Sequence, residues 1–198
     1  LCIGKESTFE FLEKVLDEVC ELFPYEYIHI GGDEAPRVRW KSCPDCQAKM
    51  KELGLENEAQ LQSYLLQRIE KYLNAKGKKI IGWDEILEGG VTPSATVMSW
   101  RGAKGGIKAA LQGNDVVMAP NSHFYLDYPQ TKDPVANKEG YVPRHYLPLK
   151  TCYSFDPYDQ LDEDAKAHIK GVQANTWCEY IRTFDHVQHM DLPRFAAL

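Results

Sequence analysis

The stretch from residue 27 to residue 34, Tyr-Ile-His-Ile-Gly-Gly-Asp-Glu, constrains most strongly what this chain can fold into. Its short apolar run with β-branched residues is typical of a buried strand. Gly31 and Gly32 follow, and they free the backbone to leave strand geometry. Because neighbouring residues on a strand point to opposite faces, Asp33 and Glu34 can serve one pocket only if the chain turns there. The glycine pair permits that turn.

A pair of adjacent carboxylates has a chemical consequence, because two such groups resist ionising together. One of them then keeps its proton and can act as an acid near neutral pH. The alternative interpretation is a strand end followed by a solvated acidic turn. Taken alone, so short a motif leaves both interpretations open.

Four more motifs lie at or just beyond the ends of predicted strands, and three of the four contain a tryptophan. They are Gly82-Trp83-Asp84-Glu85, Met98-Ser99-Trp100-Arg101-Gly102, Tyr125-Leu126-Asp127 and Gln173-Ala174-Asn175-Thr176-Trp177-Cys178-Glu179. With the acidic pair, and in this order, they resemble the catalytic domain of glycoside hydrolase family 20, the β-N-acetylhexosaminidases. The resemblance covers essentially the whole chain, so we expect residues 1–198 to be part of one catalytic barrel domain.

Hydrophobic periodicity predicts strands that alternate with helices, which indicates parallel βα units. The predicted strands are 26–30, 79–82, 96–99, 115–118 and 169–175, and the main predicted helices are 7–23, 45–53, 58–76, 104–112 and 185–198. This alternation fits a doubly wound open sheet as well as a barrel. The resemblance decides for a (β/α)8 TIM barrel, whose active site lies at the carboxyl ends of its strands. We expect the C-terminal part of that barrel, with about five of its eight strands.

Two further segments carry structural predictions. Residues 7–10, Ser-Thr-Phe-Glu, have the spacing of a capping box and predict the start of the first helix. Residues 121–157 are rich in proline and tyrosine and show little periodicity, so we expect a long functional loop there.

The resemblance implies a mechanism in which the acetamido group of the substrate replaces an enzyme nucleophile. It implies that Glu34 is the general acid and base, that Asp33 orients the acetamido N–H, and that Tyr125 donates a hydrogen bond to the acetamido oxygen. It further implies that three tryptophans enclose the sugar and that two acidic residues hold its hydroxyl groups. The tryptophans are Trp83, Trp100 and Trp177, and the acidic residues are Asp127 and Glu179.

Each of these residues also has a structural interpretation. The tyrosine and the tryptophans can be packing residues, and the two acids can form structural ion pairs. For His29 a hydrogen-bonded core histidine is favoured, and a supporting role beside the acids is the alternative. Asp84 and Glu85 are expected either to contact the sugar-binding residues without touching the sugar, or to lie at a helix N-terminus.

Composition excludes some classes of function and indicates others. The 198-residue chain has a net charge of −6, which gives no basic surface for nucleic acid, and it contains no apolar run long enough for a membrane span. It begins with Leu1 rather than an initiator methionine or a signal peptide, and both ends look cut, so we expect a piece of a longer protein. Because polymeric amino sugars are met outside the cytoplasm, a periplasmic or extracellular location is expected.

The six cysteines include a Cys43-Pro44-Asp45-Cys46 motif with the spacing of a zinc knuckle. A structural zinc site needs two more ligands, and the sequence has no second motif of this kind. We therefore assign no metal, and we expect either a loop disulfide or two free thiols at Cys43 and Cys46. The implied mechanism also needs no organic cofactor.

The expected function is that of an exo-acting, retaining β-N-acetylhexosaminidase that acts on glycans ending in N-acetylglucosamine or N-acetylgalactosamine. A non-catalytic carbohydrate-binding fragment and a disaccharide-releasing relative, such as a lacto-N-biosidase, are the alternatives. The arginine that the family supplies from its first barrel strand has no counterpart here, so we expect this fragment alone to be inactive or weak. Linkage, sugar preference and oligomeric state stay open.

Overall fold

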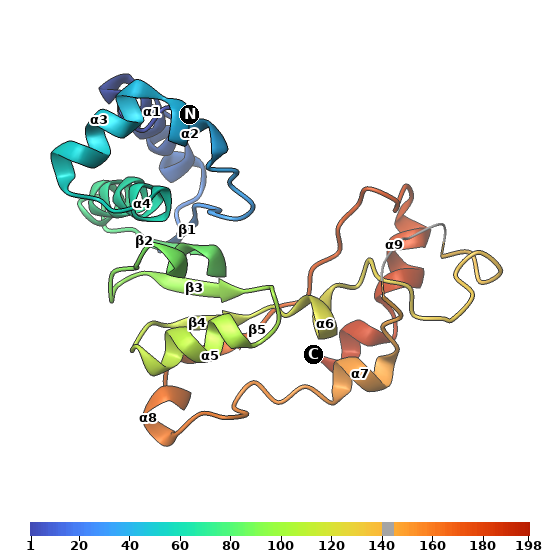
Figure 1. The fold of residues 1–198 in the computed structure, drawn as a ribbon. Helices are drawn as coiled ribbons and strands as arrows, with labels where there is room; N and C mark the ends of the chain where they lie inside the picture. The colour runs from blue at the N-terminus through green and yellow to red at the C-terminus, as the bar shows by residue number, and fades with distance from the viewer. Residues whose placement is uncertain (140–144) are drawn as a thin grey trace. The chain divides into compact units, whose positions relative to one another are not determined.

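The computed structural model describes residues 1–139 and 145–198, which form two compact units, residues 1–97 and residues 98–198. Its five strands form one sheet in chain order, and the pairings of β1 with β2 and of β4 with β5 are parallel (Figure 1). The strands are β1 (Tyr27–His29), β2 (Lys79–Trp83), β3 (Thr96–Ser99), β4 (Val116–Met118) and β5 (Ile169–Val172). Parallel strands that follow chain order are the arrangement of a partial (β/α)8 barrel, as predicted.

In the first unit, two long helices cover β1 and β2. Helix α1 (Glu6–Leu22) contacts α4 (Glu58–Asn74), and α4 contacts β2 (Figure 1). Apolar side chains of both helices and both strands meet in one core cluster, in which Leu73 and Ile80 are almost completely buried. Burying each such side chain stabilises the fold by about 1.5–3 kcal/mol.

The start of α1 differs from the prediction. The helix begins at Glu6 with Lys5 as its N-cap residue, so the capping box predicted for residues 7–10 is wrong. The reason is that the helix already begins at Glu6, so Ser7 lies inside its first turn and not at the N-cap position. The Thr8 hydroxyl donates a hydrogen bond to the carbonyl oxygen of Cys2, at 2.6 Å. This bond folds the segment before α1 back onto the helix.

Between β1 and α4 the chain forms two short helices, α2 (Val38–Ser42) and α3 (Pro44–Leu53). Helix α3 ends at Gly54, which adopts the left-handed conformation that glycine permits. After β2 comes the 3-10 helix η1 (Asp84–Glu88), which contacts α4.

In the second unit, α5 (Lys104–Leu111) contacts β4 and α8 (Glu163–Lys166) (Figure 1). The loop predicted for residues 121–157 contains two short helices, α6 (Asn121–Phe124) and α7 (Leu149–Tyr153), and its residues 140–144 lie outside the described part of the chain. Among the described residues, no helix has both the length and the apolar character that crossing a membrane requires.

The C-terminal helix predicted for residues 185–198 is wrong as a single helix. The structure has α9 (Phe184–Asp191), then Pro193, then the 3-10 helix η2 (Arg194–Ala197). Arg194 has no exposed surface, and its guanidinium donates hydrogen bonds to four backbone carbonyl oxygens. Nη2 donates to the carbonyl oxygen of Leu126 at 2.6 Å, and Nη1 donates to those of Tyr128 at 2.8 Å and Leu147 at 3.0 Å. Both Nε, at 3.1 Å, and Nη2 donate to the carbonyl oxygen of Met190.

Candidate active site

The acidic pair lies on a turn, which we call the acid turn (residues 31–34). Gly31 and Gly32 have φ of 71° and 97°, and Glu34 has φ of 44°. Glycine adopts such left-handed backbone angles freely, whereas a glutamate held there stores about 1–3 kcal/mol of strain. The predicted turn is therefore present, and it leaves the side chains of Asp33 and Glu34 exposed.

Backbone contacts with the end of β2 hold the acid turn. The backbone N–H of Trp83, the last residue of β2, donates to the carbonyl oxygen of Gly31 at 2.9 Å, which continues the pairing with β2 beyond the end of β1. A Cβ atom on Gly32 would lie 2.7 Å from Cγ2 of Ile86, too close for any side chain. Glycine at position 32 is thus required by its backbone angle and by its neighbour.

A chain of polar contacts supports the same turn from α4 and η1. The buried Gln62 side chain donates to the carbonyl oxygen of Gly32 at 2.9 Å and accepts from Arg37 Nε at 2.8 Å. Arg37 Nη1 in turn lies 2.9 Å from Glu88 Oε2. Sequence reasoning missed Gln62 and Glu88, because a glutamine within an amphipathic helix gives no sign that it will be buried.

His29 and Trp83 lie next to the acid turn. The His29 side chain is exposed, so the favoured interpretation as a core histidine is wrong, although its Nδ1 accepts a hydrogen bond from the Gly31 N–H at 3.1 Å. Its ring meets the Trp83 ring edge-on at 4.9 Å between centroids. Desolvation lowers the pKa of His29 and the charge of Asp33 opposes this, so a neutral ring that accepts at Nδ1 is favoured.

Asp84 and Glu85 form the first turn of η1, directly after Trp83. Both are buried, whereas Trp83 is half-buried. Asp84 and Glu85 therefore lie deeper in the first unit than the tryptophan that precedes them.

In the second unit, Tyr125 and its neighbours form what we call the tyrosine segment (residues 125–128). Tyr125 follows α6, so the prediction that its motif comes directly after a strand is wrong. The segment nevertheless pairs with the chain beyond β5, because the Leu126 N–H donates to Asn175 O at 2.7 Å and the Asn175 N–H donates to Phe124 O at 2.8 Å. Asn175 is another residue that the sequence did not single out.

Aromatic rings surround the Tyr125 side chain, which is only 7% exposed. Trp100 stacks on it at 6.2 Å between centroids, and Trp177 and Tyr128 meet it edge-on at 5.9 and 5.7 Å. Desolvation raises the pKa of Tyr125 above its ordinary value. A phenol in this environment stays protonated at neutral pH and can donate a hydrogen bond.

The two predicted hydroxyl-binding acids have different environments. Asp127 belongs to the tyrosine segment and is buried, at 6% exposure. Glu179 lies two residues beyond Trp177 and is exposed. The structure thus brings Trp100, Tyr125 and Trp177 into one cluster, whereas Glu179 lies on an exposed stretch.

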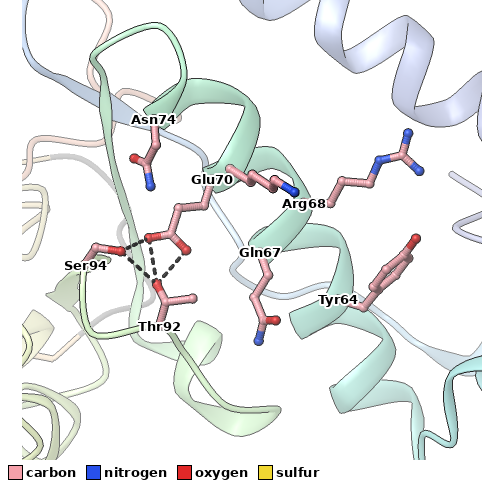
Figure 2. Close-up of a pocket in the computed structure, with 8 residues that line it drawn as sticks. Tyr64, Gln67, Arg68, Glu70, Asn74, Thr92 and Ser94 are labelled. Atoms are coloured by element: carbon pink, nitrogen blue, oxygen red, sulfur yellow. Dashed lines mark hydrogen bonds between the residues drawn. The ribbon is translucent and has the colours of Figure 1, made fainter.

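A cavity of about 530 Å³ opens in the first unit away from all of these residues (Figure 2). It lies between α4 and residues 92–94, and none of the predicted site residues lines it. In Figure 2 the buried Glu70 accepts hydrogen bonds from Thr92 and Ser94, with oxygen–oxygen distances of 2.5 to 2.6 Å. These bonds tie α4 to the segment before β3, which is a structural role.

A parallel βα sheet with paired acids and aromatic residues beyond its strand ends is the arrangement of a barrel glycosidase. Residues 1–198 match the description "Glycosyl hydrolase family 20, catalytic domain", and the chain belongs to this family. The resemblance noted in the sequence is therefore confirmed.

Relatives support the assignment. A β-hexosaminidase of Porphyromonas gingivalis is 48% identical to this chain, and the match covers 100% of this chain and 25% of that protein. A β-hexosaminidase of Vibrio furnissii is 36% identical, and the match covers 97% of this chain and 32% of that protein. Among solved structures, an exo β-N-acetylglucosaminidase of Vibrio harveyi in complex with N-acetylglucosamine has a TM-score of 0.84 and 33% identity, over 98% of this chain and 31% of that one. The chain thus spans a quarter to a third of the length of these relatives.

Proposed function

We propose that the complete protein is an exo-acting β-N-acetylhexosaminidase that retains the configuration at the anomeric carbon. Family membership supports hydrolysis of N-acetylhexosamine glycosides, and the similarity to the Vibrio harveyi enzyme supports action at the end of a glycan. The observation that carries the proposal is the acid turn, in which Glu34 is held at a left-handed φ directly after Asp33. Backbone strain of this kind persists where the surrounding structure enforces it, and it is concentrated at active sites.

Glu34 acts twice in the proposed reaction. As the acetamido oxygen of the substrate attacks the anomeric carbon, Glu34 gives its proton to the leaving glycosidic oxygen, and that carbon–oxygen bond breaks. The product of this step is a cyclic oxazolinium ion. The Glu34 carboxylate then takes a proton from water, which attacks the anomeric carbon and opens the ring. Two inversions at one carbon give net retention.

Asp33 and Tyr125 act on the acetamido group. The Asp33 carboxylate accepts a hydrogen bond from the acetamido N–H and stabilises the positive charge that develops. The Tyr125 hydroxyl donates to the acetamido oxygen. Its buried, protonated state supports this role, because a protonated phenol has a proton to donate.

The remaining residues bind the sugar in this proposal. Rings of Trp83, Trp100 and Trp177 pack on its C–H surface and exclude water. Asp127 and Glu179 accept hydrogen bonds from its hydroxyl groups, which disfavours sugars that lack them. A periplasmic or extracellular location of the complete protein fits polymeric substrates of this kind.

The test is hydrolysis of a chromogenic N-acetyl-β-glucosaminide by the complete protein, compared with the matching glucoside that lacks the acetamido group. We expect cleavage of the first substrate only, because the acetamido oxygen is the nucleophile. The configuration of the sugar first released, read by NMR before it equilibrates, is expected to be β.

Other outcomes would contradict specific parts of the proposal. Equal cleavage of both substrates would mean that an enzyme carboxylate is the nucleophile. Cleavage of neither, with sugar binding intact, would favour a carbohydrate-binding protein. Release of a disaccharide rather than a single sugar from a longer glycan would contradict the exo-acting monosaccharide specificity.

A further inference from the structure

Three cysteines from two separate segments meet at the start of α3. The Sγ atom of Cys2 lies 3.5 Å from that of Cys43 and 3.6 Å from that of Cys46, and all three sulfur atoms lie within 4.8 Å of one another. All six cysteines of the chain lie within the described residues and are free thiols. The sequence shows the Cys43–Cys46 pair but not that Cys2 joins it.

The spacing of the sulfur atoms fits a metal ion better than a disulfide. A disulfide bond requires about 2.05 Å between two sulfur atoms, and it would leave the third thiol over. Zinc binds thiolate sulfur at about 2.3 Å in tetrahedral geometry, which places two sulfur ligands about 3.8 Å apart. The two shortest sulfur–sulfur distances in the cluster approach that value.

We propose that Cys2, Cys43 and Cys46 bind a structural Zn²⁺ ion through their thiolates. The Asp45 carboxylate is a candidate for the fourth ligand, since its Oδ2 atom lies 4.0 Å from Cys2 Sγ. Zinc bound to three thiolates carries a net negative charge. Lys5, whose ammonium group lies 3.6 Å from the Asp45 carboxylate, offsets part of it.

Helix α3 positions two of the three cysteine ligands. Cys43 is its N-cap residue and Cys46 lies in its first turn, so both sulfur atoms are near the positive end of a ten-residue helix. Cys46 is fully buried in a core cluster with Ile3 and Phe9, so a ligand at this position is held rigidly.

The segment before α1 brings the third ligand to this helix. A Cβ atom on Gly4 would lie 2.2 Å from the carbonyl carbon of Asp45, so only glycine allows the two backbones to approach so closely. The hydrogen bond from Thr8 to the Cys2 carbonyl oxygen fixes the segment from the other side. A bound zinc ion would therefore tie the start of the chain to α3 and would add its binding free energy to folding.

The experiment measures zinc bound per chain in the complete protein, purified with a reducing agent, and then its zinc affinity by titration against a chromophoric chelator. Cys43→Ser is the test variant, because serine is a good N-cap residue and leaves the core cluster intact. Cys20→Ser is the matched control, because Cys20 is also half-buried in the first unit but lies outside the cluster.

We expect one zinc ion per chain in the wild type and in Cys20→Ser, and an affinity at least about 100-fold lower in Cys43→Ser, since removing only a partner of a ligand already costs about 10–100-fold. Gly4→Ala keeps all three thiols and is expected to weaken zinc binding as well. In the wild type, Co²⁺ in place of zinc is expected to give thiolate-to-metal charge-transfer absorption that Cys43→Ser reduces.

Two results would overturn the proposal. One is equal zinc affinity of the wild type and Cys43→Ser, which would mean that the thiols bind no metal together. The other is a disulfide between two of the three cysteines in the native protein, found by mass spectrometry of peptides prepared without reductant. Neither result bears on hydrolysis, because the three cysteines take no part in the proposed reaction.

Discussion

The acid turn and the tyrosine segment hold their reactive groups in opposite ways. Asp33 and Glu34 are exposed, and left-handed backbone angles and hydrogen bonds to the carbonyl oxygens of Gly31 and Gly32 hold the turn that carries them. Tyr125 is buried, and three aromatic rings hold it.

The difference fits the roles that we propose for these groups. A carboxyl group that gives and takes up a proton must reach both substrate and water, so the backbone rather than burial fixes its position. A phenol that only donates a hydrogen bond must stay neutral, and burial favours the neutral form. We therefore expect that changing a reactive group itself affects activity far more than stability, and that changing the residues that hold either segment in place affects both.

The largest effect is expected from Glu34→Gln, which keeps the size of the side chain but removes its acid. Activity of the complete protein should fall by about 10²–10⁴-fold, the usual contribution of general acid–base catalysis. The midpoint of urea unfolding should stay unchanged, because the side chain is exposed. Glu56→Gln, another exposed glutamate of the first unit, is the control. Near-normal turnover of Glu34→Gln would mean that its role is misassigned.

Tyr125→Phe removes only the hydroxyl and is expected to lower kcat by about 10²–10³-fold, as loss of one transition-state hydrogen-bond donor does. The ring remains packed, so the free energy of unfolding should change by less than about 1 kcal/mol. Tyr128→Phe, in the same cluster, is the control and should keep most of the activity. An equal loss in both variants would assign the effect to packing.

Arg194→Met tests whether the tyrosine segment depends on its surroundings more than the acid turn does. Methionine fills similar space but leaves four buried carbonyl oxygens without their donor, so the free energy of unfolding should fall by about 3–5 kcal/mol. Activity should fall with it. Arg182→Met, an exposed arginine of the second unit, should leave the unfolding midpoint unchanged.

Gly32→Ala tests the backbone of the acid turn. The new Cβ would lie 2.7 Å from Cγ2 of Ile86, and alanine disfavours the φ of 97° at this position. We therefore expect the free energy of unfolding to fall by about 1–3 kcal/mol, together with lower activity. Gly54→Ala is the matched control, because Gly54 also has positive φ, at 65°, but nothing lies within 4 Å of its added Cβ. If both variants lose the same stability and keep activity, the close contact with Ile86 does not matter.

The smallest effect is expected in the pH dependence of stability. Burial raises the pKa of Tyr125 above its ordinary value of about 10, so above that pH the unfolded chain releases the proton before the folded one. The folded state then binds more protons, and the free energy of unfolding falls as pH rises, by at most about 1.4 kcal/mol per pH unit from this residue. Urea unfolding at about pH 9 and pH 11 should show a larger decrease for wild type than for Tyr125→Phe.

Much of this architecture could be predicted from the sequence, because its signals are local. The five strands and the turn at Gly31 and Gly32 follow from short apolar runs and from glycines that no other residue can replace. The capping box failed although its spacing was right, because the helix begins at Glu6 and Ser7 lies inside its first turn. Local spacing alone does not fix the residue at which a helix begins.

The residues that support the site could not be predicted, because their partners are distant in sequence. Gln62 meets Gly32 across 30 residues, and Arg37 meets Glu88 across 51. The same holds for Cys2, which lies 41 residues from Cys43, so counting motifs alone found only two of the three thiols. Only the folded chain shows these contacts.

The buried guanidinium of Arg194 also bears on the order in which the second unit can form. Its bonds to the carbonyl oxygens of Leu126 and Tyr128 close loops of 68 and 66 residues, contacts of high order that fold slowly compared with local ones. During synthesis the tyrosine segment leaves the ribosome long before Arg194 does. The carbonyl groups of the tyrosine segment therefore lack the Arg194 guanidinium as a donor until residue 194 has been synthesised.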